Sequence, residues 1–475
     1  MSKRWPLVVG LLALWSGLFA AGLPAPSGID DVSYLDASFS LITTGKLEAP
    51  TMERYLAKWH TLGYCIQPPF YNYIVAGWLA LFGISAAGIL AFYAASYFLA
   101  SWAWWELLDF FQVGLWTRIL TLAAFVPYVL SFCLRPEPVG LALLFAGLLL
   151  LRSGGRGSLF LGFLAVGIAT GVAVNLLPAC VTLSLAVLAV RHRDRSAAAK
   201  SPPLPEIALA LAAALLVFGL LFAAMIRFQF HAFLWQFFDA VKARRGSPPY
   251  LAPREFFSYM LQYWRPVLFL PGFLGLMAVG LLSCGPAGRS LPERVRIFIW
   301  AAAGMALLGI FYRPSNLEGL TLFGWAAIFA CITSGPWRVR IKAATLTGAV
   351  GFWLLSQSLT LVSLREPRSI DPQERLRLRA ELASHPGRLV VDDFAARYLF
   401  DFRLPPGTLD VGYLRILPNY MPTAADKRPG ETWVCSTYIL NLYAPSLLES
   451  PPPALRFLGH TFDLPQDPTQ IKIVP

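Results

Sequence analysis

The stretch that decides the topology of this chain covers residues 68–84 and reads PPFYNYIVAGWLALFGI. It is apolar and aromatic, and it fits either a membrane span or an interfacial or re-entrant helix. Lys3 and Arg4 place the N-terminus inside, because Lys and Arg are enriched in cytoplasmic loops. Four later loops are basic, at residues 152–156, 191–195, 289–296 and 338–342. All four lie on the cytoplasmic side only if 68–84 does not span the membrane. We therefore interpret 68–84 as an interfacial or re-entrant helix.

The composition around this stretch is that of a polytopic membrane protein. Of 475 residues, 56% are hydrophobic and 14% are charged, against about 25% charged in soluble domains. The net charge of +12 does not indicate a nucleic-acid partner, since much of it lies in short loops where basic residues set orientation. The aromatic content suits interfacial belts and sugar or lipid contacts.

The sequence predicts a mainly α fold, a polytopic helical bundle of about 11 transmembrane helices. The run after Lys3 resembles a signal peptide, and we interpret it as an uncleaved first helix. The predicted spans are 5–23, 86–105, 116–134, 137–152, 158–174, 177–191, 206–227, 266–283, 296–312, 316–334 and 342–363. The transmembrane part is thus 1–363, with outer loops at 24–85 and 228–265.

Residues 364–475 carry charge, many prolines and shorter apolar runs, which predicts a soluble α/β domain on the outer side. We expect a helix over Asp371–Leu382 and buried strands over Arg388–Asp392 and Thr432–Ile439. Asp392 and Asp393 follow the first strand, and a solvated turn is the favoured interpretation there.

The six cysteines show no metal-binding or redox spacing. Cys65 and Cys435 would both lie on the outer side, where a disulfide between them is possible. His60 and His231 are lone histidines, typical of surface or packing positions.

An acidic pair, Asp30-Asp31, follows the first apolar run within a few residues. Carboxylates at a membrane surface are costly unless they face water, a partner or a substrate, so both are candidate functional groups. The alternative is that they cap a helix.

Basic residues on the outer side run against the positive-inside bias. Arg135 and Arg313 lie at the outer ends of predicted spans, and the loop 228–265 adds Lys242, Arg244, Arg245, Arg254 and Arg265. Arginine suits phosphate because its planar fork binds bidentately, whereas the alternative is that these side chains snorkel to lipid headgroups. The aromatics of 228–238 would line a lipid site or form an amphipathic interfacial helix.

These groups suit sugar transfer from a lipid phosphate. One carboxylate can draw the proton from an attacking hydroxyl. The phosphate is a good leaving group, so positioning and charge stabilisation supply most of the catalysis.

The motif Asp30-Asp31-x-x-Tyr34, followed by Gln67-Pro-Pro-Phe-Tyr71, resembles the Asp-Glu-x-x-Tyr and Lys/His-Pro-Pro-Leu-Tyr pattern of GT-C glycosyltransferases. The most similar branch is that of bacterial protein-mannosyltransferase-like and aminoarabinose-transferase-like proteins. Leu81-Phe-Gly83 and Arg135-Pro-Glu137 are similar to two further elements of these enzymes. The match covers roughly residues 1–200. Asp31 stands where the family usually has Glu, and Gln67 where it has a basic residue.

The resemblance implies a polyprenyl-phosphate-linked sugar donor on the periplasmic side, with Asp30 as the base and Asp31 in support. It aligns Glu137 with the family's second-loop acidic residue. Tyr34, Gln67, Tyr71 and Glu137 would position the substrates, and Arg135, Arg245 and Arg313 would bind the lipid phosphate. Asp30, Asp31 and Glu137 are the only candidates for a divalent metal ion, which the pattern does not require.

The hypothesis is therefore an inverting glycosyltransferase in a bacterial inner membrane, with its N-terminus in the cytoplasm and its C-terminal domain in the periplasm. Its partners would be the bilayer, the donor, and a lipid, glycan or protein acceptor, with no nucleic acid. The alternatives are a transporter or flippase for a lipid-linked sugar, and a non-catalytic partner of a glycan-assembly system. Predicted spans almost free of charge argue against the transporter.

Overall fold

The structure of the chain is a computed structural model. It describes residues 5–20, 31–59, 61, 63–64, 68–131, 134–193, 203–245, 275–312, 321–335, 339–362, 370–385, 387–414, 423–437, 439–440, 444–447, 454–457, 460–463 and 470–475.

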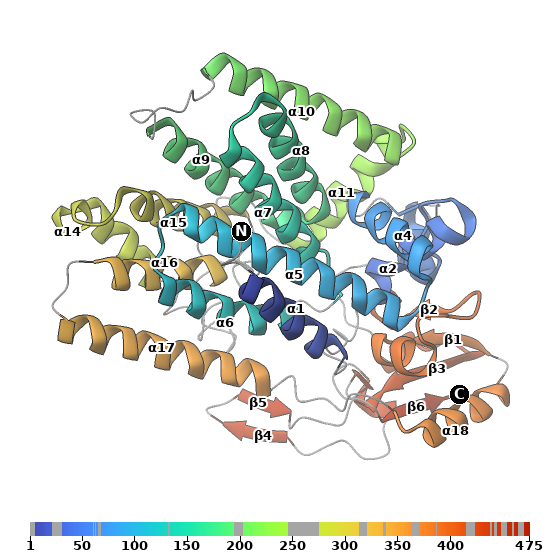
Figure 1. Ribbon diagram of the computed structural model, residues 1–475. Coiled ribbons are helices and arrows are strands. Elements are labelled where there is room, and N and C mark those ends of the chain that lie inside the picture. Colours follow the sequence, from blue (N-terminus) through green and yellow to red (C-terminus); the bar gives the residue numbers. More distant parts are fainter. Residues whose placement is uncertain are drawn as a thin grey trace.

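The described part of the chain is mainly helical, with a small sheet near the C-terminus (Figure 1). The helices are α1 Trp5–Ala20, α2 Asp31–Thr44, α3 Glu53–Leu56, α4 Phe70–Phe82, α5 Ala86–Phe110, α6 Leu115–Ser131, α7 Glu137–Ser153, α8 Arg156–Val172, α9 Leu177–Arg193, α10 Leu204–Met225, α11 Phe230–Arg245, α14 Pro286–Arg289, α15 Glu293–Tyr312, α16 Thr321–Ser334, α17 Val339–Val362 and α18 Pro372–Ala383. A further apolar helix covers Gly275–Cys284.

Three of the described helical stretches are long and apolar enough to cross a membrane. They are Ala86–Phe110 with 25 residues, Val174–Arg193 with 20 and Leu204–Met225 with 22. Only 11% of the most apolar window of the third is buried, so α10 presents leucines around most of its surface, as a lipid-facing helix does. These helices indicate a membrane protein, whereas the count of about 11 spans stays a prediction.

The stretch that decides the topology forms α4, which has 13 residues. At 1.5 Å per residue this helix is about 20 Å long, shorter than a hydrocarbon core of about 30 Å. It starts after Pro69 and ends at Gly83, which has a φ of 85° and so stops the helix in a conformation that glycine tolerates. The length is consistent with an interfacial or re-entrant helix.

The helices pack around a core that α5, α7 and α8 share. Trp104 of α5 stacks on Phe145 of α7 with ring centroids 5.0 Å apart, and it meets Phe323 of α16 edge-on at 5.3 Å. A Cβ on Gly147 of α7 would lie 2.9 Å from the carbonyl oxygen of Gly162 of α8. Glycine at this contact lets the two helix backbones approach closely, as small residues do between membrane helices.

The C-terminal segment, residues 370–475, contains a four-stranded sheet of order β2-β1-β3-β6. The strands are β1 Arg388–Val391, β2 Leu409–Asp410, β3 Glu431–Ser436 and β6 Ile471–Val474, with β1 parallel to β2 and β3, and β3 antiparallel to β6. A separate hairpin pairs β4 Ala454–Phe457 with β5 His460–Asp463. The predicted helix is α18 and the first predicted strand is β1, so both are confirmed. The second predicted strand is β3, which ends at Ser436 rather than Ile439.

Alternate residues of this sheet face two different cores. Val391 and Val434 belong to the core that the helical bundle forms, whereas Val390, Trp433 and Cys435 pack on the opposite side. The two-residue period of β-strands explains this division. The sheet is therefore anchored on the bundle by one of its faces.

The C-terminal segment also contacts residues 31–85, here called the acidic-motif segment (Figure 1). The Arg388 guanidinium lies 2.5 Å from the Glu53 carboxylate, and Arg54 forms an ion pair with Glu431 whose two side chains are largely buried. These contacts hold the C-terminal segment against α3.

Candidate functional site

Motif residues from three distant parts of the sequence meet at the starts of α2, α4 and α7. The ring of Tyr34 on α2 lies edge-on to the ring of Tyr71 on α4, with centroids 6.4 Å apart. The guanidinium carbon of Arg135, just before α7, lies 5.8 Å from the centroid of the Tyr34 ring. Glu137 is the first residue of α7. The structure thus brings four of the predicted site residues together.

Glu137 is the buried acid of this cluster, with 4% of its surface exposed. Its Oε1 accepts a hydrogen bond of 2.8 Å from Nδ2 of Asn175, and Nη2 of Arg135 lies 3.5 Å from the same oxygen. Its Oε2 is buried and, among the described residues, has no hydrogen-bond partner. The first turn of a helix favours a negative charge, so α7 helps to hold the carboxylate with one oxygen left for a ligand.

Arg135 is a partly exposed cation that lies between an aromatic ring and a carboxylate. Its side chain is 30% exposed, it lies over an aromatic ring, and it is held near a carboxylate. A guanidinium over an aromatic face is attracted by the ring quadrupole. The 3.5 Å separation from Glu137 is long for a charge-assisted hydrogen bond, so the attraction between the two groups is mainly one of charge.

Two tyrosine hydroxyls fix the position of α4 relative to α5 and α7. The hydroxyl of Tyr71 hydrogen-bonds with that of Tyr93 on α5 and also donates to the carbonyl oxygen of Leu134 at 3.2 Å. Both rings are buried. Because Leu134 immediately precedes Arg135, Tyr71 ties the Pro-Pro helix to the loop that carries the arginine.

An asparagine connects α4 to α2. Nδ2 of Asn72 donates to the carbonyl oxygen of Tyr34 at 3.1 Å and to Oγ of Ser38 at 3.3 Å, and all three residues are buried. The two parts of the acidic motif pattern, separated by more than thirty residues in the sequence, are therefore held in one register.

A carboxylate of the C-terminal segment accepts a hydrogen bond from the start of α2. α2 begins at Asp31, and the backbone N–H of Val32 donates to Oδ1 of Asp393 at 2.8 Å. Asp30 and the side chain of Asp31 lie outside the described residues, so their predicted catalytic roles stay predictions. The favoured interpretation of Asp392 and Asp393 as a solvated turn is wrong, because both residues are fully buried.

Two other buried carboxylates have clear structural partners. Oδ2 of Asp36 accepts hydrogen bonds of 2.8 Å from both the backbone N–H and the hydroxyl of Thr51, and burial raises the pKa of Asp36 to about 7. Asp392 accepts from the N–H of Ala395 and from the N–H and hydroxyl of Ser436, and burial likewise raises its pKa to about 7. In both groups the hydrogen bonds lower the pKa, but burial raises it by more because it disfavours the charged form.

The remaining phosphate candidates are not placed in this cluster. Gln67 and Arg313 lie outside the described residues, and Arg245 is the last residue of α11, with a side chain outside the description. α11 itself contacts the acidic-motif segment, because Nε2 of Gln236 donates to the carbonyl oxygen of Gly63 at 3.0 Å. Of the aromatics in 228–238, Phe233 is buried whereas Trp235 and Phe238 are exposed.

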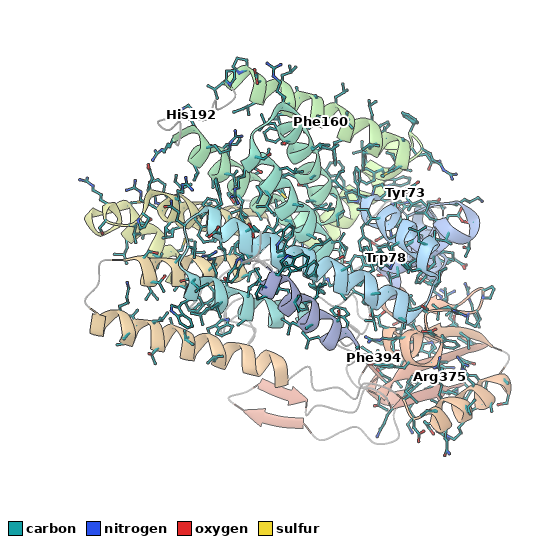
Figure 2. The ribbon with its side chains drawn as sticks, in the orientation of Figure 1. Tyr73, Trp78, Phe160, His192, Arg375 and Phe394 are labelled. Atoms are coloured by element: carbon teal, nitrogen blue, oxygen red, sulfur yellow. The ribbon has the colours of Figure 1, made fainter. Side chains whose placement is uncertain are left out.

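A hydrogen bond also joins α4 to the end of α10, and Tyr73, which donates it, is labelled in Figure 2. The hydroxyl of Tyr73 on α4 donates to the carbonyl oxygen of Met225 at 3.1 Å, at the end of α10. The helix after the Pro-Pro motif is therefore bonded to α2, α5 and α10.

Two of the three candidate metal ligands, Asp30 and the side chain of Asp31, lie outside the described residues. No group of three His, Cys, Asp or Glu side chains among them is placed to hold an ion. The guanidinium near Oε1 of Glu137 would repel a cation there. Cys435 is a free, buried thiol on β3, so the disulfide with Cys65 is not formed.

Four residues of the cluster were missed by sequence reasoning: Asn72, Tyr93, Asn175 and Asp393. Asn175 and Asn72 carried a usable signal, since polar side chains within apolar membrane segments are expensive and mark functional positions.

The whole chain was compared with protein-family models and with curated proteins. No family model matches the chain, and no curated protein matches it.

Proposed function

We propose that this protein is a membrane glycosyltransferase of GT-C type. It moves a sugar from a polyprenyl-phosphate-linked donor to an acceptor hydroxyl on the periplasmic side of a bacterial inner membrane. The N-terminus is cytoplasmic, and residues 364–475 form a periplasmic domain.

The observation that supports this proposal most is the convergence of the motif residues. Tyr34, Tyr71, Arg135 and Glu137 come from elements far apart in the sequence, and the acidic motif, the Pro-Pro motif and the Arg-Pro-Glu element meet in one buried cluster. Unrelated loop residues would have no reason to share one site. A cation, an acidic oxygen without a partner and aromatic walls are the groups that binding of a lipid phosphate and a sugar needs.

In the proposed reaction, the carboxylate of Asp30 takes the proton of the acceptor hydroxyl as its oxygen attacks the anomeric carbon. The bond from that carbon to the phosphate oxygen breaks, and polyprenyl phosphate leaves with the electron pair. Attack opposite the phosphate inverts the anomeric centre. Arg135 binds the phosphate, with Arg245 and Arg313 as further cations, and a planar guanidinium suits this task.

The other cluster residues position the reactants. The free Oε2 of Glu137 accepts a hydrogen bond from a sugar hydroxyl, and Asp31 and Tyr34 hold the acceptor side of the site, with Gln67 and Tyr71 at the Pro-Pro motif. Of the three predicted candidates for a metal ion only the Glu137 side chain is among the described residues, and no step of the proposal uses a metal.

The experiment is mass spectrometry of polyprenyl-phosphate sugars and surface glycans from the host bacterium. A deletion strain is complemented with wild type, with Asp30→Asn, or with Asp371→Asn as a control, all at matched protein level. Asp371 caps α18 through a bond to the N–H of Gln373, remote from the acidic motif in sequence.

We expect Asp30→Asn to accumulate the same donor and lose the same glycan mass as the deletion, whereas Asp371→Asn restores the wild-type profile. The accumulated mass then names the sugar. A wild-type profile with Asp30→Asn would mean that Asp30 only caps a helix. It would favour the flippase or the non-catalytic partner instead.

A further inference from the structure

The contact between Asp393 and Val32 joins the C-terminal segment to the first turn of α2. The N–H of Val32 donates to Oδ1 of Asp393 over 2.8 Å, and the two residues are separated by 361 positions in the sequence. Only 1% of Val32 and none of Asp393 is exposed. A hydrogen bond that a carboxylate accepts away from water is stronger than a surface contact.

Asp393 is held firmly on its own side of this contact. Its neighbour Asp392 accepts hydrogen bonds of 2.7 to 2.8 Å from Ala395 and Ser436, which ties the end of β1 to the end of β3. The following residue, Phe394, is buried in the second core of the C-terminal segment, and its position can be followed in Figure 2. The backbone at Asp393 is therefore fixed relative to two strands.

The other side of the contact leads directly to the site. The first N–H groups of a helix have no partner within it, so a carboxylate there stabilises the helix start and fixes where the helix begins. Val32 follows Asp31 and precedes Tyr34 by two positions. A displacement of this turn would shift the Tyr34 ring away from Arg135, which lies 5.8 Å from it.

We propose that Asp393 is a positioning residue of the transferase site. It holds the first turn of α2 so that Asp31 and Tyr34 keep their places relative to Arg135. This inference rests on the proposed glycosyltransferase function. It makes the C-terminal segment a working part of the site rather than a cover over it.

The chain offers a matched control for this contact. Oδ1 of Asp401 accepts a hydrogen bond of 2.9 Å from the N–H of Ala86, at the start of α5. This is the same kind of bond, from a helix start to a carboxylate of the C-terminal segment, but the first turn of α5 carries no motif residue. Asp401 has a φ of 54°, where glycine is unstrained, so Asp401→Gly removes the carboxylate without adding backbone strain.

The experiment measures transfer by the purified full-length protein in lipid nanodiscs. The donor probe is the polyprenyl-phosphate-sugar fraction extracted from the deletion strain. Wild type, Asp393→Ala, Asp393→Asn and Asp401→Gly are compared for kcat and for KM of the donor. Hydrogen exchange of peptides covering residues 31–36 reports on the first turn of α2.

We expect Asp393→Ala to lower kcat by on the order of 10- to 100-fold with a much smaller change in KM, because small misplacements of reacting groups cost this much. Its α2 peptide should exchange faster. Asp393→Asn keeps an oxygen acceptor and should regain most of kcat. Asp401→Gly should lose thermal stability but keep kcat.

The two proposals fail in different ways. Wild type without transfer activity would overturn the proposed function, and this inference with it. Active wild type with Asp393→Ala no more impaired in kcat than Asp401→Gly would overturn the inference alone. Equal loss of kcat in Asp393→Ala and Asp393→Asn would also overturn it, because the hydrogen bond would then not be what matters.

Discussion

Asn175 and Glu137 form a buried polar pair between the 3-10 turn before α9 and the first residue of α7. Nδ2 of Asn175 donates to Oε1 of Glu137 over 2.8 Å. Asparagine has no charge to neutralise the acid, so its effect is to orient the carboxylate and leave Oε2 without a partner. A carboxylate held in this way is ready to receive a ligand hydroxyl.

We predict that Asn175→Leu destabilises the protein and lowers transfer together. Removing the donor leaves a buried carboxylate oxygen unsatisfied, which costs about 1 to 3 kcal/mol. Thermal unfolding in detergent and transfer kinetics would measure the two effects. Thr182→Val is the control, because its hydroxyl only donates to the carbonyl oxygen of Pro178 one turn earlier in α9. Full activity of Asn175→Leu would show that transfer does not depend on the Glu137 carboxylate.

We predict that Arg135→Lys raises the donor KM by about tenfold, with a larger rise in Arg135→Ala. Lysine keeps the charge but loses the planar fork and the stacking over Tyr34. The measurement is donor-dependent transfer kinetics. Arg403→Lys serves as the control, since the Arg403 side chain donates to the carbonyl oxygen of Ile84, away from the cluster of Tyr34, Tyr71 and Glu137. An unchanged KM in Arg135→Ala would place the phosphate elsewhere.

We predict that Tyr71→Phe and Tyr93→Phe each destabilise the protein, and that their effects are not additive. Tyr71 bonds both to the Tyr93 hydroxyl and to the carbonyl oxygen of Leu134, so its loss removes two hydrogen bonds of about 1 kcal/mol each. Thermal unfolding of both variants and of the double variant completes a double-mutant cycle. Strictly additive effects would show that the two hydroxyls do not interact.

The raised pKa of Asp36 predicts a pH dependence of stability. Its pKa in the folded protein is about 7, above the ordinary value, so the folded state binds this proton more tightly than the unfolded state. The contribution of Asp36 to the free energy of unfolding is fully present below its ordinary pKa of 3.8. It falls by about 1.4 kcal/mol per pH unit as the pH rises towards 7. Above pH 7 the contribution no longer changes with pH.

Asp36→Asn isolates this effect, because one amide oxygen can accept both bonds that Thr51 donates to Oδ2. The difference in unfolding temperature between variant and wild type should grow in favour of the variant from pH 5 to pH 7. A difference that does not change with pH would show that Asp36 is ionised throughout.

Local patterns in the sequence predict the secondary elements well. The helix α18 and the strand β1 follow from apolar spacing and from Asp371 as a cap. The short helix α4 follows from the apolar run after Pro69. Arg135, Glu137, Tyr34 and Tyr71 could be chosen because each belongs to a spaced motif.

Long-range partners could not be chosen in this way. Tyr93 is one aromatic among many in the apolar helix α5, and its hydroxyl bond depends on how α4 packs. Asp393 looks like a turn residue, since nothing local indicates that a helix start 361 positions away lies against it. Packing of the C-terminal sheet on the bundle decides that contact, and it has no signature along the chain.

The central claim is tested most directly by converting the donor with the purified protein. Wild type or Asp30→Asn in nanodiscs is incubated with the polyprenyl-phosphate-sugar fraction and an acceptor extract, and the lipids are followed by mass spectrometry. The account predicts that wild type releases polyprenyl phosphate as the acceptor gains one sugar mass, and that Asp30→Asn releases none. Unchanged donor with wild type, or equal release by Asp30→Asn, would contradict it.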